Sequence, residues 1–283
     1  MSDASFDCPP TLTDQEVLEF CKNGYLILKA VVPDEINRRT LGFLDEHPSN
    51  EPMEILNEDW FVDAVIKNPQ AAGAVRSLLG PNFELPRLIS NHRVKCPLTH
   101  SGGWHRDGGA SDKLHLDFLQ VFYYPQETPR ELGPTEVVPS SHLLRIKRRF
   151  MAHYGNIRQG RSTAAPAGSI FITHYSIWHR ATRSSASGIR NLLKYNYFRT
   201  ASPQRDWLAD PDFDFTQVSF ANDNALPEKW SDSIRVAQLF LWLCGLEERF
   251  EFKGGQSWPI TAGTGYQINQ GMPSALAPRN EDI

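Results

Sequence analysis

The middle of this 283-residue chain, from residue 82 to residue 200, consists of short β-rich runs separated by clusters of Gly, Pro and Ser. Many short runs of this kind are typical of a β-sandwich or barrel, because each strand ends in a turn before the next one pairs with it. The clearest runs are 89–95, 118–124, 135–138, 169–173 and 192–198. The pattern therefore predicts a mainly β core.

Helices and one more strand are expected before this core. The threonines of Thr11–Thr13 offer an N-cap for a helix that runs to about Lys22. Residues 25–28 read as a short strand, and residues 33–44 have the pattern of a second amphipathic helix that starts at a proline. The predicted order of this part is helix, strand, helix.

A third helix is expected over 231–246, followed by a tail rich in Gly and Pro from Gly254 onward. A chain of this length can bury one substantial core, so we predict a single domain. Its predicted parts are an N-terminal support of helix and strand over 1–81, a core over 82–200 and a C-terminal helix and tail over 201–283.

Charge and composition narrow the possible partners. A net charge of -4 gives no electrostatic reason to expect nucleic acid or an anionic membrane. The four cysteines form no CxxC pair, the first residues lack a secretory signal, and no apolar run is long enough to span a bilayer. We therefore expect a cytoplasmic protein, a monomer or homodimer, that acts on a small molecule.

The segment around Trp104–Gly109 contains a His-x-Asp pair, His105 and Asp107, among glycines. In an extended segment, side chains two residues apart point to the same face and can bind one metal. Two imidazoles and one carboxylate form the facial triad that leaves positions open on Fe(II). The pair predicts two of three metal ligands.

The residues alone leave alternatives for each ligand. His115 and Asp117 form a second His-x-Asp pair, although Asp117 leads directly into an apolar strand. A third ligand is expected far downstream, and both His174 and His179 are candidates for it.

Several segments resemble the phytanoyl-CoA dioxygenase family. Gly168–His179 is similar to the family's final metal-ligand segment, in which the ligand histidine closes a stretch that begins with glycine. Leu132–His142 is similar to the family turn Asn-Gly-x-Thr-x-x-x-Pro-Gly-Ser-His, from which Leu132 and Ser140 depart. Arg93–Pro97 and the first helix and strand also resemble the family, so the resemblance spans about residues 11 to 200.

The resemblance implies a double-stranded β-helix, or jelly roll, with His105, Asp107 and His179 as the ligands of Fe(II). It also implies that Arg190, eleven residues after His179, binds the far carboxylate of 2-oxoglutarate, for which a guanidinium fork is well suited. Three further cofactor or substrate contacts are implied at Thr135, Asn91 and Gln120.

The function implied is that of a 2-oxoglutarate-dependent non-haem iron dioxygenase, which takes dioxygen and releases succinate and CO2. Hydroxylation, desaturation or ring formation is favoured over halogenation, because Asp107 fills the position that halogenases of related folds leave for chloride. Two alternatives stay open, a zinc-binding hydrolase or isomerase and a non-catalytic jelly-roll binding protein. The substrate, a CoA ester or a free metabolite, does not follow from the sequence.

Overall fold

The structure is a computed structural model that describes residues 5–107, 113–144, 148–151, 153–214, 218 and 229–246. Its helices are α1 (Asp14–Asn23), α2 (Asp34–Glu46), α3 (Asp59–Phe61), α4 (Pro69–Leu79), α5 (Arg148–Met151) and α6 (Lys229–Leu243). Its strands are β1 (Ser5–Phe6), β2 (Tyr25–Leu28), β3 (Phe83–Glu84), β4 (Ile89–Asn91), β5 (Val94–Cys96), β6 (Phe118–Tyr124), β7 (Thr135–Val138), β8 (Arg161–Ser162), β9 (Ser169–His174), β10 (Trp178–Ala181), β11 (Gly188–Arg190) and β12 (Leu193–Phe198).

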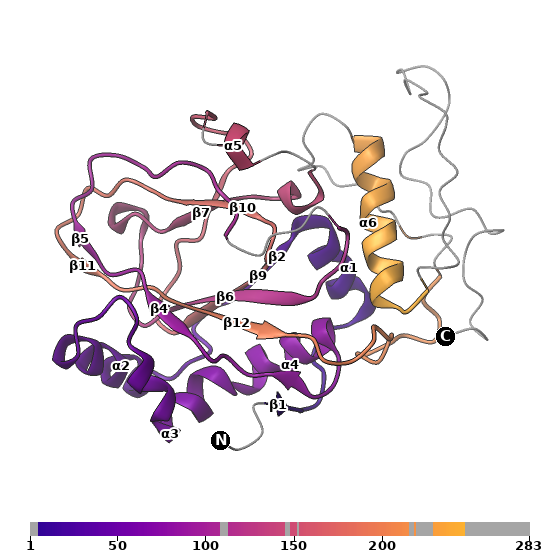
Figure 1. Cartoon of the computed structure of the whole chain (residues 1–283), viewed down its shortest axis with the longest axis horizontal. Helices are drawn as coiled ribbons and strands as arrows, with labels where there is room; N and C mark the ends of the chain where they lie inside the picture. The colour runs from indigo at the N-terminus through magenta and orange to yellow at the C-terminus, as the bar shows by residue number, and fades with distance from the viewer. Residues whose placement is uncertain are drawn as a thin grey trace.

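Two antiparallel sheets form the core of the fold. The large sheet has the order β1-β3-β12-β6-β9-β2, and β4 also pairs with β12. The small sheet has the order β10-β7-β8, and β11 pairs with β5 in a separate ribbon. In Figure 1 the small sheet lies above β6 and β12 of the large one. The predicted jelly-roll architecture, mainly β with flanking helices, is confirmed, although within the described residues the sheets stay open and do not close into a barrel.

Side chains alternate between the two faces of the large sheet. On β6, Phe122 and Tyr124 face the small sheet and pack with Val137 of β7 and Phe171 of β9. The intervening residues, such as Val121, join the larger core under the helices. Period-two alternation explains this division, since successive strand residues point to opposite faces.

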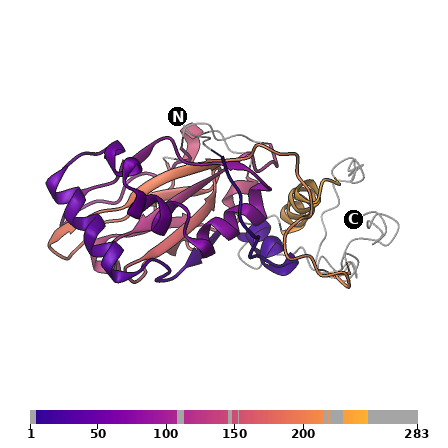
Figure 2. The ribbon, with the colours of Figure 1, turned by 90° about the horizontal axis from the view of Figure 1, so that it is seen from below.

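The second face of the large sheet is covered by helices. Helices α2, α3 and α4 lie along this side, opposite the small sheet, as the view from below in Figure 2 also shows. Helix α4 begins after Asn68, whose side chain accepts hydrogen bonds from the N–H groups of Gln70 and Ala71, and it buries Ala72, Val75 and other apolar residues. This layer was not predicted in detail, and it anchors the sheet that carries part of the site.

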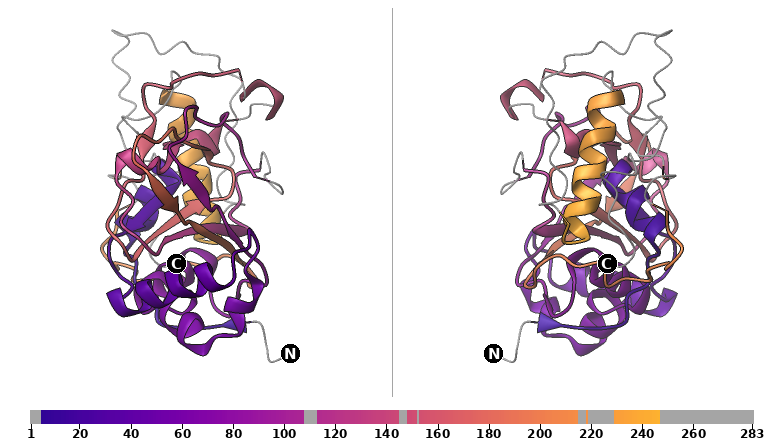
Figure 3. Two further views of the ribbon diagram at one scale, coloured as in Figure 1. Left: turned by 90° about the vertical axis from the view of Figure 1, so that its left-hand side faces the viewer. Right: turned by 90° about the vertical axis from the view of Figure 1, so that its right-hand side faces the viewer.

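Helix α1 confirms the predicted N-terminal helix. Thr13 caps it, and its hydroxyl and the Glu16 carboxylate form a reciprocal capping box. The helix ends at Gly24, which has a positive φ of 77° that glycine adopts without strain. The last described helix, α6, packs beside α1; it lies to the right of the sheets in Figure 1 and in front of them in the right panel of Figure 3.

The other predicted elements are placed close to where the sequence indicated. The run 118–124 and the run 135–138 are strands with the predicted bounds. The run 89–95 is divided into β4 and β5, because the chain leaves β12 after Asn91 and then pairs with β11. The predicted tail from Gly254 lies outside the described residues. Within the part of the chain that is described, no helix is both long and apolar enough to cross a membrane.

Candidate metal centre

Three side chains meet between the two sheets, and they are the three predicted ligands. His105, Asp107 and His179 offer ligand atoms that all lie within 4.8 Å of one another. Asp107 Oδ1 is 3.7 Å from His105 Nε2, and Asp107 Oδ2 is 3.5 Å from His179 Nε2. Among the described residues, this is the only group of at least three such side chains with the geometry to hold a metal ion.

Both histidines present the same ring nitrogen to the centre. Nδ1 of His105 is 2.9 Å from the carbonyl oxygen of Gly103, and Nδ1 of His179 is 3.3 Å from that of Ile177. A nitrogen that faces a carbonyl must carry the proton, so each Nε2 is left with a lone pair for a metal. Nε2 of His179 is buried without a hydrogen-bond partner. The donor set therefore fits a divalent metal such as Fe(II).

Electrostatics keep this site in the form that binds metals. Burial would raise the pKa of Asp107, but the contact with His179 and the charge of Lys194 outweigh it and hold that pKa well below its usual value. Burial lowers the pKa of His105, so its neutral form is favoured. A carboxylate and neutral imidazoles are the protonation states that coordination requires.

Lys194 and Gln120 fix the orientation of Asp107. Lys194 Nζ donates to Asp107 Oδ2 over 2.9 Å, and the Gln120 side-chain amide donates to the same oxygen. Two donors on one carboxylate oxygen favour coordination through the other, as a monodentate ligand requires. Gln120 is thus placed at the metal site, while its predicted contact with a cofactor stays a prediction. Lys194 was not predicted, although a single lysine in the apolar strand Leu193–Phe198 was a signal for it.

Arg190 is buried on β11 with only 2% of its surface exposed. Its Nη1 donates to the carbonyl oxygen of Gly133, its Nε has no hydrogen-bond partner, and no acidic side chain pairs with it among the residues described. Burial lowers the pKa of this guanidinium. An unpaired buried cation is costly, so this position favours an anionic ligand, and the predicted contact with 2-oxoglutarate stays a prediction.

Gly133 shapes the wall beside Arg190. It has a positive φ of 66°, and a Cβ there would lie 2.6 Å from the carbonyl oxygen of Thr182. Only glycine fits at this place, which brings the carbonyl of the turn within reach of Arg190. Ser140, where the family turn has glycine, adopts a positive φ of 65° and donates its hydroxyl to the Lys22 carbonyl.

Thr135 is buried at the start of β7, and its neighbours lead to Arg190. Its backbone N–H donates to the hydroxyl of Tyr124 over 3.3 Å, and that hydroxyl also contacts Thr163. Tyr124 interacts electrostatically with Arg190, so these residues surround one polar region. A contact between Thr135 and a cofactor remains a prediction, and Tyr124 and Thr163 are neighbours that the sequence did not indicate.

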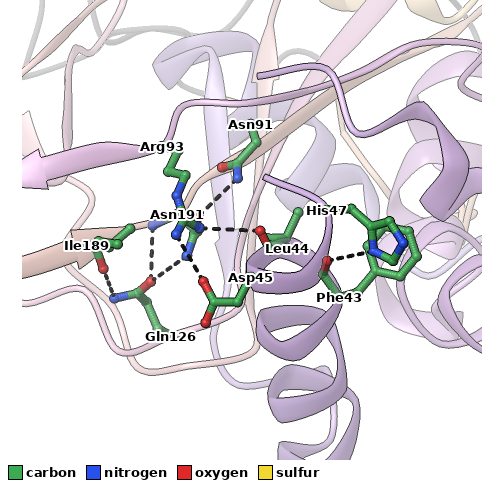
Figure 4. Close-up of polar contacts among 9 residues, drawn as sticks. All are labelled: Phe43, Leu44, Asp45, His47, Asn91, Arg93, Gln126, Ile189 and Asn191. Carbon is green, nitrogen blue, oxygen red and sulfur yellow. Dashed lines mark hydrogen bonds and ion pairs between the residues drawn. The ribbon is translucent and has the colours of Figure 1, made fainter. Parts of the chain in front are cut away.

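Asn91 is placed beside Arg190 rather than at the metal. Its Nδ2 donates to Asn191 Oδ1 over 3.0 Å, and its Oδ1 accepts from the N–H of Leu192 over 3.2 Å. Figure 4 shows Asn91, Arg93 and Gln126 converging on Asn191, the residue that follows Arg190. Both amide atoms are thus engaged with the chain, and the predicted cofactor contact of Asn91 stays a prediction.

The rival candidates lie elsewhere. His174 is buried, and its ring accepts from the N–H of Ser176 and donates to the carbonyl of His115. His115 stacks on Trp242 of α6, with ring centroids 4.7 Å apart. Neither belongs to the metal group, so within the described residues the second His-x-Asp pair has a structural environment.

Two tryptophans stand behind the ligands. Trp104 and Trp178, each adjacent to a ligand histidine, are buried and pack with Val138 and Met151. The Trp104 indole donates to the carbonyl of Gly155 over 2.7 Å, and Arg180 stacks on its ring. Both rings are thus buried beside the ligand histidines.

Comparison with known proteins places this architecture among related folds. The chain resembles apo HygX from Streptomyces hygroscopicus with a TM-score of 0.55 and 14% identity, over 68% of this chain and 88% of HygX. It resembles the epimerase SnoN, solved with Fe3+, alpha ketoglutarate and nogalamycin RO, with a TM-score of 0.53 and 16% identity, over 66% of this chain and 83% of SnoN. At these identities the likeness concerns the fold. No curated protein matches the chain by sequence.

The family model for phytanoyl-CoA dioxygenase matches residues 9–192, which is more than half of the chain and includes all three candidate ligands and Arg190. The match confirms the resemblance noted in the sequence and the predicted class of non-haem iron enzyme. The chain belongs to the phytanoyl-CoA dioxygenase family.

Proposed function

We propose that this chain uses Fe(II), 2-oxoglutarate and dioxygen to oxidise a small organic substrate, with hydroxylation as the preferred outcome and succinate and CO2 as co-products. The observation that carries the proposal is the pairing of a His-Asp-His group with a buried arginine that has no acidic partner among the described residues. A metal site alone would suit many reactions. A metal site with a separate cationic pocket suits a co-substrate that has two carboxylates.

Each residue has a role in this proposal. His105, Asp107 and His179 would hold Fe(II), which supplies the oxidative chemistry. Arg190 would bind the far carboxylate of 2-oxoglutarate, with Thr135 and Tyr124 lining that end of the pocket. The tryptophan layer behind β10 would exclude water on that side of the metal.

Two related structures support the choice of metal and co-substrate. HygX has been solved with nickel and 2-oxoglutarate bound, and SnoN with Fe3+ and alpha ketoglutarate. SnoN is described as an epimerase, so the fold by itself does not select the reaction. Hydroxylation, desaturation and ring formation are therefore separated by product analysis.

The proposal is tested by anaerobic titration of the protein with Fe(II) and 2-oxoglutarate. We expect the weak visible charge-transfer band of an iron chelate in the wild type, and no band in His179→Ala. His100→Ala, which removes an exposed histidine outside the metal group, is the matched control and keeps the band. A folded, iron-loaded wild type without the band would contradict the proposal.

Metal analysis separates this proposal from the zinc alternative. Protein purified without oxygen is expected to contain iron and, once dioxygen and a reductant such as ascorbate are supplied, to convert 2-oxoglutarate to succinate slowly even without substrate. Stoichiometric zinc together with no succinate would favour a hydrolase or isomerase. Absence of any bound metal and of succinate would favour a binding protein.

A further inference from the structure

Lys194 brings a positive charge to the metal site in addition to that of the metal. It lies on β12 between the buried residues Leu193 and Tyr195, and 20% of its side chain is exposed. Its ammonium group has three donor hydrogens, of which the bond to Asp107 Oδ2 uses one. No other acceptor for this ammonium group lies among the described residues, so its remaining donors can bind a ligand at the edge of the site.

The strand places Lys194 on the face of the large sheet that carries Gln120. Lys194 is opposite Phe122 in the register with β6, and Asn196 is opposite Gln120. Residues two apart on a strand share a face and lie roughly 7 Å apart. Lys194, Asn196 and Phe198 therefore form a row about 13 Å long that leads away from the metal.

A cavity begins at the far end of this row. It has a volume of about 300 Å³ and is lined by Glu84, Arg87, Leu88, Asn196 and Phe198. Leu88 is 74% exposed and Phe198 is 39% exposed, so its apolar part is open to a ligand. Asn196 borders the cavity and is the cross-strand neighbour of Gln120, which contacts the metal ligand Asp107.

The sum of the charges at the metal site indicates the net charge of a ligand that would bind beside it. Fe(II) brings two positive charges, and Arg190 and Lys194 bring one each. Asp107 removes one and 2-oxoglutarate removes two, which leaves one positive charge, because imidazoles that bind a metal are neutral. Because the site is partly shielded from water, this excess favours a ligand with one negative charge.

We propose that Lys194, Asn196, Phe198 and Leu88 form the substrate-binding site, and that the substrate is an amphipathic anion. Its carboxylate binds the Lys194 ammonium near the metal, and its apolar part lies along β12 against Phe198 and Leu88. This inference rests on the proposed function, because the charge excess includes Fe(II) and 2-oxoglutarate.

The test uses octanoate and octanamide, which share a chain and differ in charge. Their binding to the anaerobic complex with Fe(II) and 2-oxoglutarate is measured by isothermal titration calorimetry. We expect the wild type to bind octanoate at least ten-fold more tightly than octanamide. Lys194→Met is expected to lose this preference, and Lys194→Arg, which keeps the positive charge, is expected to retain it.

Leu88→Ser tests the apolar end and, because Leu88 is exposed, leaves the fold intact. It is expected to weaken the binding of octanoate and of octanamide by a similar factor, about three-fold or more, since part of the apolar contact is removed. The proposal is overturned if the wild type binds neither probe or binds both equally, or if Lys194→Met keeps the preference.

Loss of the preference in Lys194→Arg as well would also overturn the proposal, because the preference would then not follow the positive charge at this position. Absence of the band in the wild type would instead contradict the proposed function. The exposed side chains of Leu88 and Phe198 could instead bind a second copy of the chain. Dimerisation that depends on protein concentration and is abolished by Leu88→Ser would show this, and it would count against a substrate site.

Discussion

His105 and His179 hydrogen-bond to each other through their backbones, with N–H to carbonyl distances of 3.1 and 3.0 Å. This pair joins the loop after β5 to strand β10 and brings the two imidazole centroids within 4.4 Å. The main chain therefore holds two metal ligands in place independently of any metal.

Removal of the metal is expected to leave the fold intact for this reason. Metal at about one hundred times its Kd would add roughly 2.7 kcal/mol to the free energy of unfolding, and chelation would remove only that amount. Circular dichroism and thermal melting with and without a chelator provide the measurement. Loss of the β signal on chelation would show that the metal is needed for folding.

Substitution of Arg190 is expected to separate co-substrate binding from stability. Arg190→Met should raise the KM for 2-oxoglutarate about 100-fold, since two charge-assisted hydrogen bonds at about 1.5 kcal/mol each are lost. The same change should not lower the melting temperature of the free protein, because it removes a buried cation without an acidic partner among the described residues.

Arg183→Met is the matched control for this experiment, because Arg183 is exposed in the loop before β11. It should leave the KM unchanged. Equal effects of the two substitutions, or a large loss of stability in Arg190→Met alone, would contradict a role of Arg190 in binding 2-oxoglutarate.

The polar network of Figure 4 is expected to position Arg190. Gln126 Oε1 accepts from the backbone N–H of Asn191 over 3.0 Å, and Gln126 Nε2 donates to the Ile189 carbonyl over 2.9 Å. Gln126→Met should therefore weaken 2-oxoglutarate binding about ten-fold with Fe(II) affinity unchanged. Gln126→Glu keeps the acceptor and should recover most of the binding; calorimetric titration of each ligand decides between the outcomes.

Stability is expected to fall with acid because of buried His142. Burial lowers its pKa to about 4, and its Nε2 bonds the Cys21 carbonyl. The unfolded chain, with a pKa near 6.5, binds a proton that the folded chain does not, so stability is lost as pH falls from about 6.5 to about 4. The loss approaches about 1.4 kcal/mol per pH unit for this residue.

Urea unfolding at several pH values measures this slope. His142→Gln retains a donor for the Cys21 carbonyl and should show a smaller pH dependence than the wild type. His174, whose pKa burial also lowers, stays in both proteins and accounts for a remaining slope. An unchanged slope in His142→Gln would show that His142 does not titrate on unfolding.

Spacing predicted His105 and Asp107, which are two residues apart in an extended segment, but it left the pair His115 and Asp117 as an alternative. The resemblance of the stretch that begins at Gly168 to the family's metal-ligand segment was needed to choose His179 over His174. Strand patterns predicted β6 and β7 because one face of each strand is apolar and meets a buried layer. These features depend on neighbours in the chain, so the sequence displays them directly.

The features that the sequence did not predict depend on contacts between residues that lie far apart in the chain. Lys194 contacts Asp107, which lies 87 positions away in the chain. Asn91 is held by Asn191, which is one hundred positions away. The division of the run 89–95 into two strands likewise depends on partners that lie beyond residue 185. Pairing of this kind leaves no local pattern from which it could be predicted.

The backbone pair of His105 and His179 also sets the order in which the protein can mature. During synthesis on the ribosome, His105 and Asp107 emerge before His179 of β10. The long loop between them closes at low entropic cost only when the intervening strands are paired. A nascent chain therefore offers no complete cage to a metal until the small sheet has docked. We therefore expect iron to bind late in maturation, after the sheets have folded around the site.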